Sequence, residues 1–440
     1  MPDPAHEEAK TLLQRLIACD TSNPPGREAQ AAAILEAYLE PFGTECERVA
    51  KDPERPNLLA RLRGRGDGPS LAFLGHLDVV QARRQDWTVE PFAAVERDGA
   101  IWGRGSVDMK CQVAATAVAL ATLAREGFVP NGDLMLILTA DEEVGDAAVG
   151  APFFVEQKPD LRPDYVVGEG AGERYETPRG PIYLVDHGVK QTASATLTVH
   201  GRPGDASLAD HAASATSELA RLLTRLDEYE PTPRIHPAVE PLLELLAPGV
   251  DGDVARVAAA RAANPGLGLV IGALVTNVFQ ATVITAPGPR NVVREEVSVT
   301  VSCVALPGVT KAELEAELRQ ALGEGRYTLE VAEPEGGLLS PTTSPLRAAI
   351  EEFLAERDPR ARLVPTLGYG YSDCDTMREA YGSITHGFIP FPNADPLVNL
   401  TTKHGIDERV RLDDLAFQTD AALHVARTVG SLSRKTAAAA

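Results

Sequence analysis

Three apolar runs that end in acidic or histidine side chains most constrain how this chain can fold. Each run is short and continuous, which is typical of a strand buried on both faces. Segments with helical periodicity lie between the runs, including residues 7–18 and about 28–39. Strands alternating with helices predict an α/β fold with a mixed, mostly parallel sheet between helices. The runs and the polar residues that follow them are Leu71–Gly75 with His76 and Asp78, Leu134–Ala140 with Asp141, Glu142 and Glu143, and Tyr165–Gly168 with Glu169.

A second domain is expected inside the first, because 440 residues exceed what one hydrophobic core usually supports. From about Ala193 the pattern changes to short strands at 195–199, 278–285 and 297–306, with a helical, Pro- and Ala-rich insert near 231–263. We interpret residues 193–306 as an α+β domain inserted between the two parts of the first domain, 1–192 and 307–440.

Charge and cysteine usage argue against several classes of partner. The net charge is −21, from 42 basic and 63 acidic residues, and no dense Lys/Arg cluster is present. Nucleic acid and anionic membranes are therefore poor candidates as partners. No apolar run approaches the length of a membrane-spanning helix, and the polar, acidic start lacks a signal-peptide core. Five scattered cysteines without Cys-x-x-Cys spacing favour reduced thiols and a cytoplasmic location.

Seven polar residues at strand ends or in loops are the candidates for chemistry. A lone acidic residue in a loop is usually solvated and a lone histidine is usually structural, so no single member decides the matter. Carboxylates that converge in one cleft repel one another unless cations compensate their charge. Imidazole and carboxylate without thiolate form a ligand mixture expected for catalytic Zn²⁺ or Mn²⁺. The seven are His76, Asp78, Asp108, Glu142, Glu143, Glu169 and His404.

The motifs around these residues resemble a known family, and they occur in the same order over nearly the whole chain. The family comprises the dinuclear zinc metallopeptidases and amidohydrolases, including aminoacylase, glutamate carboxypeptidase, acetylornithine deacetylase and succinyl-diaminopimelate desuccinylase. The resemblance implies a zinc-peptidase-like catalytic domain and a ferredoxin-like lid through which the chain forms a homodimer. The motifs are Gly75-His76-Leu77-Asp78, Trp102-Gly-Arg-Gly-Ser-Val-Asp108, Asp141-Glu142-Glu143, Gly168-Glu169-Gly170 and His404-Gly-Ile-Asp-Glu408.

The resemblance also implies a role for each candidate. His76, Glu169, Glu143 and His404 would be terminal ligands of two Zn²⁺ ions, with Co²⁺ or Mn²⁺ as substitutes, and Asp108 would bridge both ions. Glu142 would be the general base, and Asp78 would orient His76. The implied reaction is hydrolysis of an amide bond in a small peptide or N-acyl substrate. Carboxylate–imidazole contacts and metal-assisted activation of water are consistent with these roles.

Four departures from the family pattern concern the substrate. Asp205 stands where a lid histidine usually supports the oxyanion, and Val304 stands where an arginine usually holds the substrate carboxylate. Asp375 replaces a second arginine, and Arg294 in Asn291-Val-Val-Arg294 replaces a proline. Asp205, Asn291, Arg294, Asp375 and Arg378 are thus the candidate substrate-binding residues.

Three explanations of these departures stay open at this stage. The alignment is shifted by a few residues, so that His187 or His211 replaces the histidine and Arg294 or Arg378 replaces the arginine. Alternatively, the substrate lacks a free carboxylate or carries a positive charge. In the third explanation the chain is a non-catalytic, metal-binding homodimer. The complete metal set together with Glu142 favours a working hydrolase.

Overall fold

The computed structural model describes residues 3–145, 149–211 and 213–437 and divides into two compact units. Unit 1 takes its residues from Met1–Gly188, Leu338–Gly368 and Ser372–Ala440, and unit 2 comprises Val189–Gly337 with Tyr369–Tyr371. Unit 2 thus interrupts the sequence of unit 1, and its main segment spans 189–337 where the sequence pattern suggested an α+β domain at 193–306.

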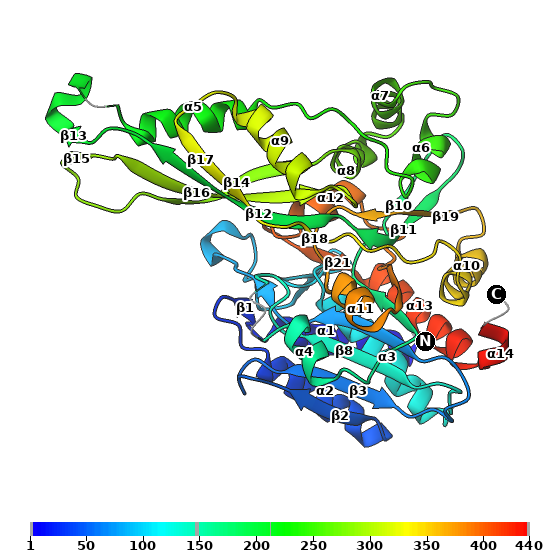
Figure 1. Ribbon diagram of the computed structural model, residues 1–440. Coiled ribbons are helices and arrows are strands. Elements are labelled where there is room, and N and C mark those ends of the chain that lie inside the picture. Colours follow the sequence, from blue (N-terminus) through cyan, green and yellow to red (C-terminus); the bar gives the residue numbers. More distant parts are fainter. Residues whose placement is uncertain (1–2, 146–148, 212, 438–440) are drawn as a thin grey trace. The chain divides into compact units, whose positions relative to one another are not determined.

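A nine-stranded mixed sheet forms the centre of unit 1 (Figure 1). Its central strands β8, β4, β9 and β20 run parallel, whereas the flanking strands pair antiparallel. The predicted mixed sheet is confirmed, but it is not mostly parallel, because β2, β3, β10 and β11 add four antiparallel pairs to the three parallel pairs in the middle. Its strands are β2 (Glu45–Val49), β3 (Asn57–Leu62), β4 (Leu71–His76), β8 (Leu134–Thr139), β9 (Tyr165–Gly168), β10 (Arg174–Tyr175), β11 (Ile182–Val189), β19 (Arg362–Gly368) and β20 (Ile384–Gly387).

Helices cover both faces of this sheet. Successive strand residues point to opposite sides, so a continuously apolar strand has apolar side chains to bury on each face. On β4, Leu71 and Phe73 join the larger core with α1, α2, α3, α10 and α13, whereas Ala72 and Leu74 join a smaller core with α4 and α11. Both faces are therefore apolar, as the continuous runs in the sequence predict. These helices are α1 (Pro4–Ile17), α2 (Ala29–Leu39), α3 (Lys110–Arg125), α4 (Ala151–Gln157), α10 (Pro345–Arg357), α11 (Asp373–Tyr381) and α13 (Leu412–Gly430).

Small strand pairs at the periphery of unit 1 shape the loops between its larger elements. The parallel pair β1 (Ser22–Asn23) and β5 (Val79–Val80) brings an N-terminal loop beside the end of β4. A three-stranded sheet joins β6 (Val95–Arg97), β7 (Ala100–Trp102) and β21 (Arg409–Arg411). Segments about 300 residues apart in sequence therefore lie side by side. The remaining helices of unit 1 are α12 (Pro396–Thr402) and α14 (Arg434–Ala437).

Unit 2 is built on a five-stranded antiparallel sheet whose core is closed by two helices, α5 and α9 (Figure 1). The helical insert predicted near 231–263 is present as three short helices and extends to Val275. The elements are β12 (Gln191–His200), β14 (Val278–Thr285), β16 (Glu296–Ala305), β17 (Tyr327–Val331), β18 (Glu335–Gly336), α5 (Ala215–Asp227), α6 (Glu240–Leu246), α7 (Asp253–Ala263), α8 (Pro265–Val275), α9 (Lys311–Leu322) and the β13 (Gly204–Asp205)–β15 (Val292–Val293) pair.

The C-terminal boundary of the inserted unit lies at Gly337, not at 306 as the sequence pattern suggested. Strand β17 pairs with β12, and Leu314 and Leu318 of α9 lie in the core of unit 2. The helix that begins with the capping box of Thr310 and Glu313 therefore completes the inserted domain instead of opening the second catalytic segment.

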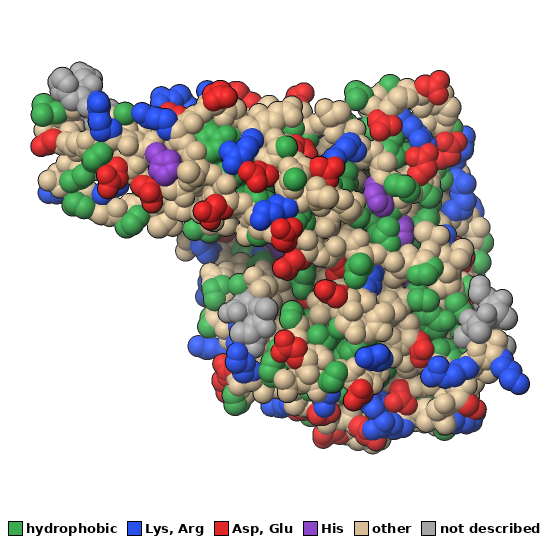
Figure 2. Space-filling model, viewed as in Figure 1, with side chains coloured by type: hydrophobic (Ala, Val, Ile, Leu, Met, Phe, Trp, Pro, Cys, Tyr) green, Lys and Arg blue, Asp and Glu red, His purple; other side chains and the backbone are tan. Residues whose placement is uncertain are grey.

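The surface of each unit is mixed in charge. On the face shown in Figure 2, Asp and Glu side chains are interspersed with Lys and Arg side chains on both units. Among the described residues, no helix is both long enough and apolar enough to cross a membrane.

The corrected boundary predicts which fragment folds on its own. A fragment of residues 189–337 should unfold cooperatively, because it contains every strand and helix of the unit 2 core. A fragment of residues 193–306 lacks β17 and α9, which leaves the buried faces of β12 and α5 uncovered. Thermal unfolding followed by circular dichroism should give a sigmoidal transition for the first fragment only. A cooperative transition in the shorter fragment would contradict the assignment.

Candidate metal centre

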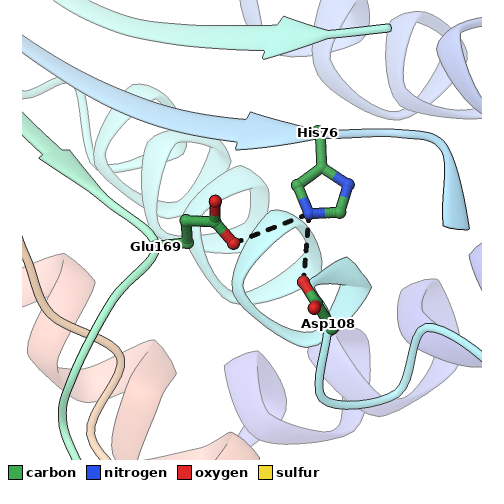
Figure 3. Close-up of side chains that lie close together, drawn as sticks. All are labelled: His76, Asp108 and Glu169. Atoms are coloured by element: carbon green, nitrogen blue, oxygen red, sulfur yellow. Dashed lines mark hydrogen bonds and ion pairs between the residues drawn. The ribbon is translucent and has the colours of Figure 1, made fainter. Parts of the chain in front are cut away.

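His76 lies at the carboxyl end of β4, where neighbouring parallel strands bring further polar residues to the same edge of the sheet. Its ring is buried, and its Nε2 atom is 3.0 Å from Asp108 Oδ1 and 3.7 Å from Glu169 Oε2. Figure 3 shows Asp108 and Glu169 both directed toward this nitrogen. His76, Asp108 and Glu169 therefore form one group that could hold a metal ion.

A second group shares Asp108 with the first. His404 Nε2 is 3.0 Å from Asp108 Oδ2 and 2.9 Å from Glu143 Oε2. Asp108, Glu143 and His404 offer ligand atoms that all lie within 4.8 Å of one another. The two oxygens of Asp108 thus face different groups, which is the arrangement needed for a carboxylate that bridges two ions. We call these groups the His76 triad and the His404 triad.

Asp78 contacts both His76 and the loop that carries Glu142 and Glu143, which we call the glutamate loop. The ring Nδ1 of His76 lies 3.0 Å from the backbone oxygen of Asp78 and 3.6 Å from its carboxylate. The carboxylate itself accepts hydrogen bonds from the backbone N–H groups of Glu142 and Glu143, each at 3.2 Å. It also accepts one from Asn23 Nδ2 at 2.9 Å. The predicted orienting role therefore belongs chiefly to the backbone of Asp78, while its side chain anchors the glutamate loop.

The electrostatics of both triads favour added positive charge. Burial lowers the pKa of His76, but its hydrogen bond to Asp108 and the nearby carboxylates of Asp78 and Glu169 outweigh burial and raise the pKa well above its usual value. Hydrogen bonds to Asp108 and Glu143 raise the pKa of His404 to about 9. Carboxylates that stabilise an imidazolium in this way also stabilise a metal cation at the same point.

The donor set fits catalytic divalent cations. The two triads offer only imidazole nitrogens and carboxylate oxygens, the mixture used for zinc or manganese in enzymes. The second oxygen of Glu143, Oε1, is buried and has no hydrogen-bond partner among the described residues. A buried carboxylate oxygen without a donor is costly, and a bound cation removes that cost.

Glu142 is adjacent to the triads but belongs to neither of them. Burial, then the charge of Glu169, raises the pKa of the Glu142 carboxyl well above its usual value. Its backbone N–H is fixed by Asp78, and the preceding residue, Asp141, has a left-handed φ of 62°. Such a conformation is uncommon outside glycine and directs the chain sharply after β8. Adjacent glutamates can therefore take different positions in the site.

The five candidate substrate-binding residues are divided between the two units, with Asp375 and Arg378 in unit 1. Asp375 is buried and pairs with Arg378 at 3.2 Å, and Arg378 also donates to Ser340 and Thr385. The negative charge of Asp375 is thus balanced by the guanidinium of Arg378. The guanidinium of Arg378 is in turn occupied by its contacts with Asp375, Ser340 and Thr385.

The other three candidates, Asp205, Asn291 and Arg294, belong to unit 2; Asp205 and Asn291 are exposed, and Arg294 is half-buried. The carboxylate of Asp205 accepts hydrogen bonds from the backbone and hydroxyl of Ser207. Among the alternative histidines, His187 is buried in β11 and belongs to unit 1, whereas the side chain of His211 lies outside the described residues.

Sequence reasoning missed three residues beside the metal candidates. Asn23 links Asp78 to Asp141, with an Nδ2–Oδ1 distance of 2.7 Å to the latter. Lys403 places its ammonium 3.3 Å from Asp108 Oδ2. Glu408, although part of a recognised motif, received no role. For Lys403, its position next to His404 was the available signal, whereas the contacts of Asn23 follow from the pairing of β1 with β5.

Comparison with known proteins gives the family and the fold of the chain. Residues 72–428 match the model of peptidase family M20/M25/M40. Succinyl-diaminopimelate desuccinylase from Parvibaculum lavamentivorans is 34% identical over 227 residues, which are 50% of this chain and 54% of that protein. The chain thus spans about half the length of the curated relatives it matches.

Two solved structures share the fold over nearly their whole length. Human carnosine dipeptidase 1 superposes with a TM-score of 0.72 at 16% identity, covering 97% of both chains. An M20 family metallo-carboxypeptidase from Sulfolobus solfataricus gives a TM-score of 0.70 at 17% identity, covering 97% of this chain and 99% of that one.

Removal of metal should destabilise the protein, because an ion that binds only the native state stabilises it by mass action. At a free zinc concentration about 100 times Kd, each site adds about 2.7 kcal/mol to the free energy of unfolding. We therefore expect a chelator to lower Tm and zinc to restore it, as measured by differential scanning calorimetry. His404→Gln should reduce the zinc-dependent shift, whereas His6→Gln, whose ring contacts Asp420 instead, should not. An unchanged Tm after chelation would contradict the site.

Proposed function

The chain belongs to peptidase family M20/M25/M40, and we propose that it is a metal-dependent hydrolase that cleaves an amide bond of a small substrate. The observation that carries this proposal is the pair of triads that share Asp108, with Glu142 beside them. A structural metal site is usually closed by its ligands and needs no additional carboxylate. Here a glutamate outside both triads is available for proton transfer.

We propose two zinc ions as the cofactors, with cobalt or manganese as substitutes. His76 and Glu169 would hold one ion, Glu143 and His404 the other, and Asp108 both. When bound, the ions supply Lewis-acid polarisation of the amide carbonyl and make a water molecule more acidic. The imidazole and carboxylate donors support this choice over a thiolate-bound structural metal.

The residues of the chain then have distinct tasks. A carboxylate oxygen of Glu142 accepts a proton from the attacking water and delivers it to the leaving nitrogen. Asp78 holds the backbone of Glu142 and Glu143, so that proton transfer and metal ligation occur at fixed positions. Asn23 ties Asp78 to Asp141 and thereby limits movement of this loop.

The proposed substrate is a dipeptide or an N-acyl amino acid. The family description, together with similarity to proteins named desuccinylase, supports an amide bond between small groups. A panel of dipeptides and N-acyl amino acids, assayed with zinc-, cobalt- and manganese-loaded protein, tests this class. Absence of turnover with every metal, despite full metal content, would favour the alternative of a metal-binding protein without catalysis. The five free cysteines support a cytoplasmic location.

Two substitutions should separate proton transfer from metal binding. Glu142→Gln should lower kcat by roughly a hundredfold to ten-thousandfold, the usual contribution of a general base, while metal content stays near that of the wild type. Asp108→Asn should instead lose metal, because a neutral amide is a poor bridge between two cations. Steady-state kinetics and elemental analysis on the same preparations measure both effects. Metal loss in Glu142→Gln, or full occupancy in Asp108→Asn, would reverse the assignment.

We also propose that unit 2 forms a homodimer through strand β14. This strand lies at the edge of its sheet and exposes Val283 and Ile284, by 52% and 56% respectively. An exposed apolar edge strand is a template for pairing with a second chain, and a charge on it opposes pairing. Sedimentation velocity should therefore give a dimer for the wild type and a monomer for Val283→Lys combined with Ile284→Lys. Val254→Lys, at an equally exposed valine on α7, is the control and should remain dimeric.

A further inference from the structure

Two loops that carry ligands of the His404 triad are fastened to each other by a short strand pair. Strand β7 ends at Trp102, just before the loop that leads to Asp108, and β21 begins at Arg409, just after the loop from His404. Trp102 and Arg409 are paired residues in the ladder, and Gly103 N–H donates to the backbone oxygen of Glu408 at 2.9 Å. The β7–β21 pair thus holds together the ends of the two loops that carry the candidate ligands Asp108 and His404.

The side chain of Glu408 occupies the space between these loops. Its Oε1 accepts hydrogen bonds from the N–H groups of Val107 at 2.6 Å and Asp108 at 2.9 Å. Its Oε2 accepts from Gly105 N–H at 2.9 Å and from Arg104 Nη1 at 2.6 Å. The carboxylate is fully buried, so both its charge and its four hydrogen bonds are shielded from water.

Arg104 links Glu408 to the loop that carries His404. Its second terminal nitrogen, Nη2, donates to the backbone oxygen of Gly405, the residue after His404. Its guanidinium also lies over the Trp87 ring, 5.1 Å from the centroid. A bidentate guanidinium has a fixed fork geometry, so it sets the distance between Glu408 and Gly405.

The positions of His76 and Glu169 depend less on the contacts of Glu408 and Arg104 than that of His404 does. His76 ends β4 and Glu169 follows β9, and these strands are neighbours in the main sheet. His76 is paired with Thr139 of β8, and Gly168, the residue before Glu169, is paired with Gly387 of β20, so sheet pairing holds both ligands in place. His404, by contrast, lies in a loop with a φ of 57°, and its side chain is 53% exposed. All three ligands of the His404 triad, Asp108, Glu143 and His404, lie in loops.

We propose that Glu408 is a positioning residue which, through Arg104, holds Asp108 and His404 at the spacing required by the metal position of the His404 triad. This inference rests on the proposed function, because it assumes that both triads bind metal. Loss of the Glu408 contacts should weaken the His404 position selectively. Residues that orient metal ligands typically contribute about 10–100-fold to metal affinity.

Glu408→Gln tests this inference in the full-length protein. The amide has one acceptor oxygen and a donor group in place of the second oxygen, so either the Val107 and Asp108 pair or the Gly105 and Arg104 pair of contacts is lost. Zinc affinity and stoichiometry are measured by competition with a chromophoric chelator. The wild type should bind two zinc ions tightly, and the variant should bind one tightly and the other about 10–100-fold more weakly.

Asp414→Asn is the matched control for loss of a buried carboxylate. Asp414 is also fully buried and accepts hydrogen bonds from Asn393, but it contacts no residue of either triad. This variant should retain both zinc sites at wild-type affinity. A second comparison identifies the affected position: in a His76→Gln background, adding Glu408→Gln should abolish the one remaining tight site.

The outcomes distinguish this inference from the proposed function. If wild type does not bind two zinc ions, the dinuclear site itself is wrong. If wild type binds two and Glu408→Gln retains both, or weakens both equally, the positioning role of Glu408 is wrong while the site stands. If Glu408→Gln does not fold, Arg104→Lys decides in the same assay, because it retains the charge beside Glu408 and removes the fork to Gly405. Two tight zinc sites in that variant would overturn the inference.

Discussion

The mutual repulsion of buried carboxylates is the constraint on which the catalytic unit depends. Asp108, Glu143 and Glu169 meet around two histidines at one edge of the sheet, with Glu142 close by. At such distances in a partly buried site, like charges cost several kcal/mol unless a cation lies among them. The fold must therefore hold these groups together against their own electrostatics, and the cations proposed to offset the repulsion are also the proposed agents of chemistry.

The structure meets this constraint with two kinds of support. Strand β4 fixes His76 through its ladder with β8, and β9 positions Glu169 through its ladder with β20. The apolar cores on both faces protect these hydrogen bonds. The loops are held instead by buried polar side chains: Asp78 for the glutamate loop and Glu408 for the loop of Asp108. Each of these two carboxylates accepts hydrogen bonds from two or more backbone N–H groups. These bonds take the place of the regular backbone hydrogen bonds that a loop lacks.

Much of this arrangement could be predicted from the sequence, because its signals are local. Runs such as Leu134–Thr139 indicate buried strands, and residues after such runs lie at one edge of a parallel sheet. The five predicted ligands do come together, although their occupation by metal stays a prediction. The remainder depends on pairings between distant segments. The contacts of Glu408, the neutralisation of Asp375 by Arg378 and the assignment of β17 to unit 2 each require knowledge of a tertiary neighbour that no local pattern specifies.

The split of unit 1 around its insertion has a consequence for the order in which the site can assemble. His76, Asp108 and Glu169 all precede the inserted unit in the chain, whereas His404 and Glu408 follow it. The Arg104–Glu408 pair joins residues 304 positions apart. During synthesis, the ligands of one triad emerge from the ribosome long before the other triad can be completed. If both triads bind metal as proposed, a nascent chain can hold a single ion before the second triad exists, and the proposed hydrolysis awaits the segment that carries His404.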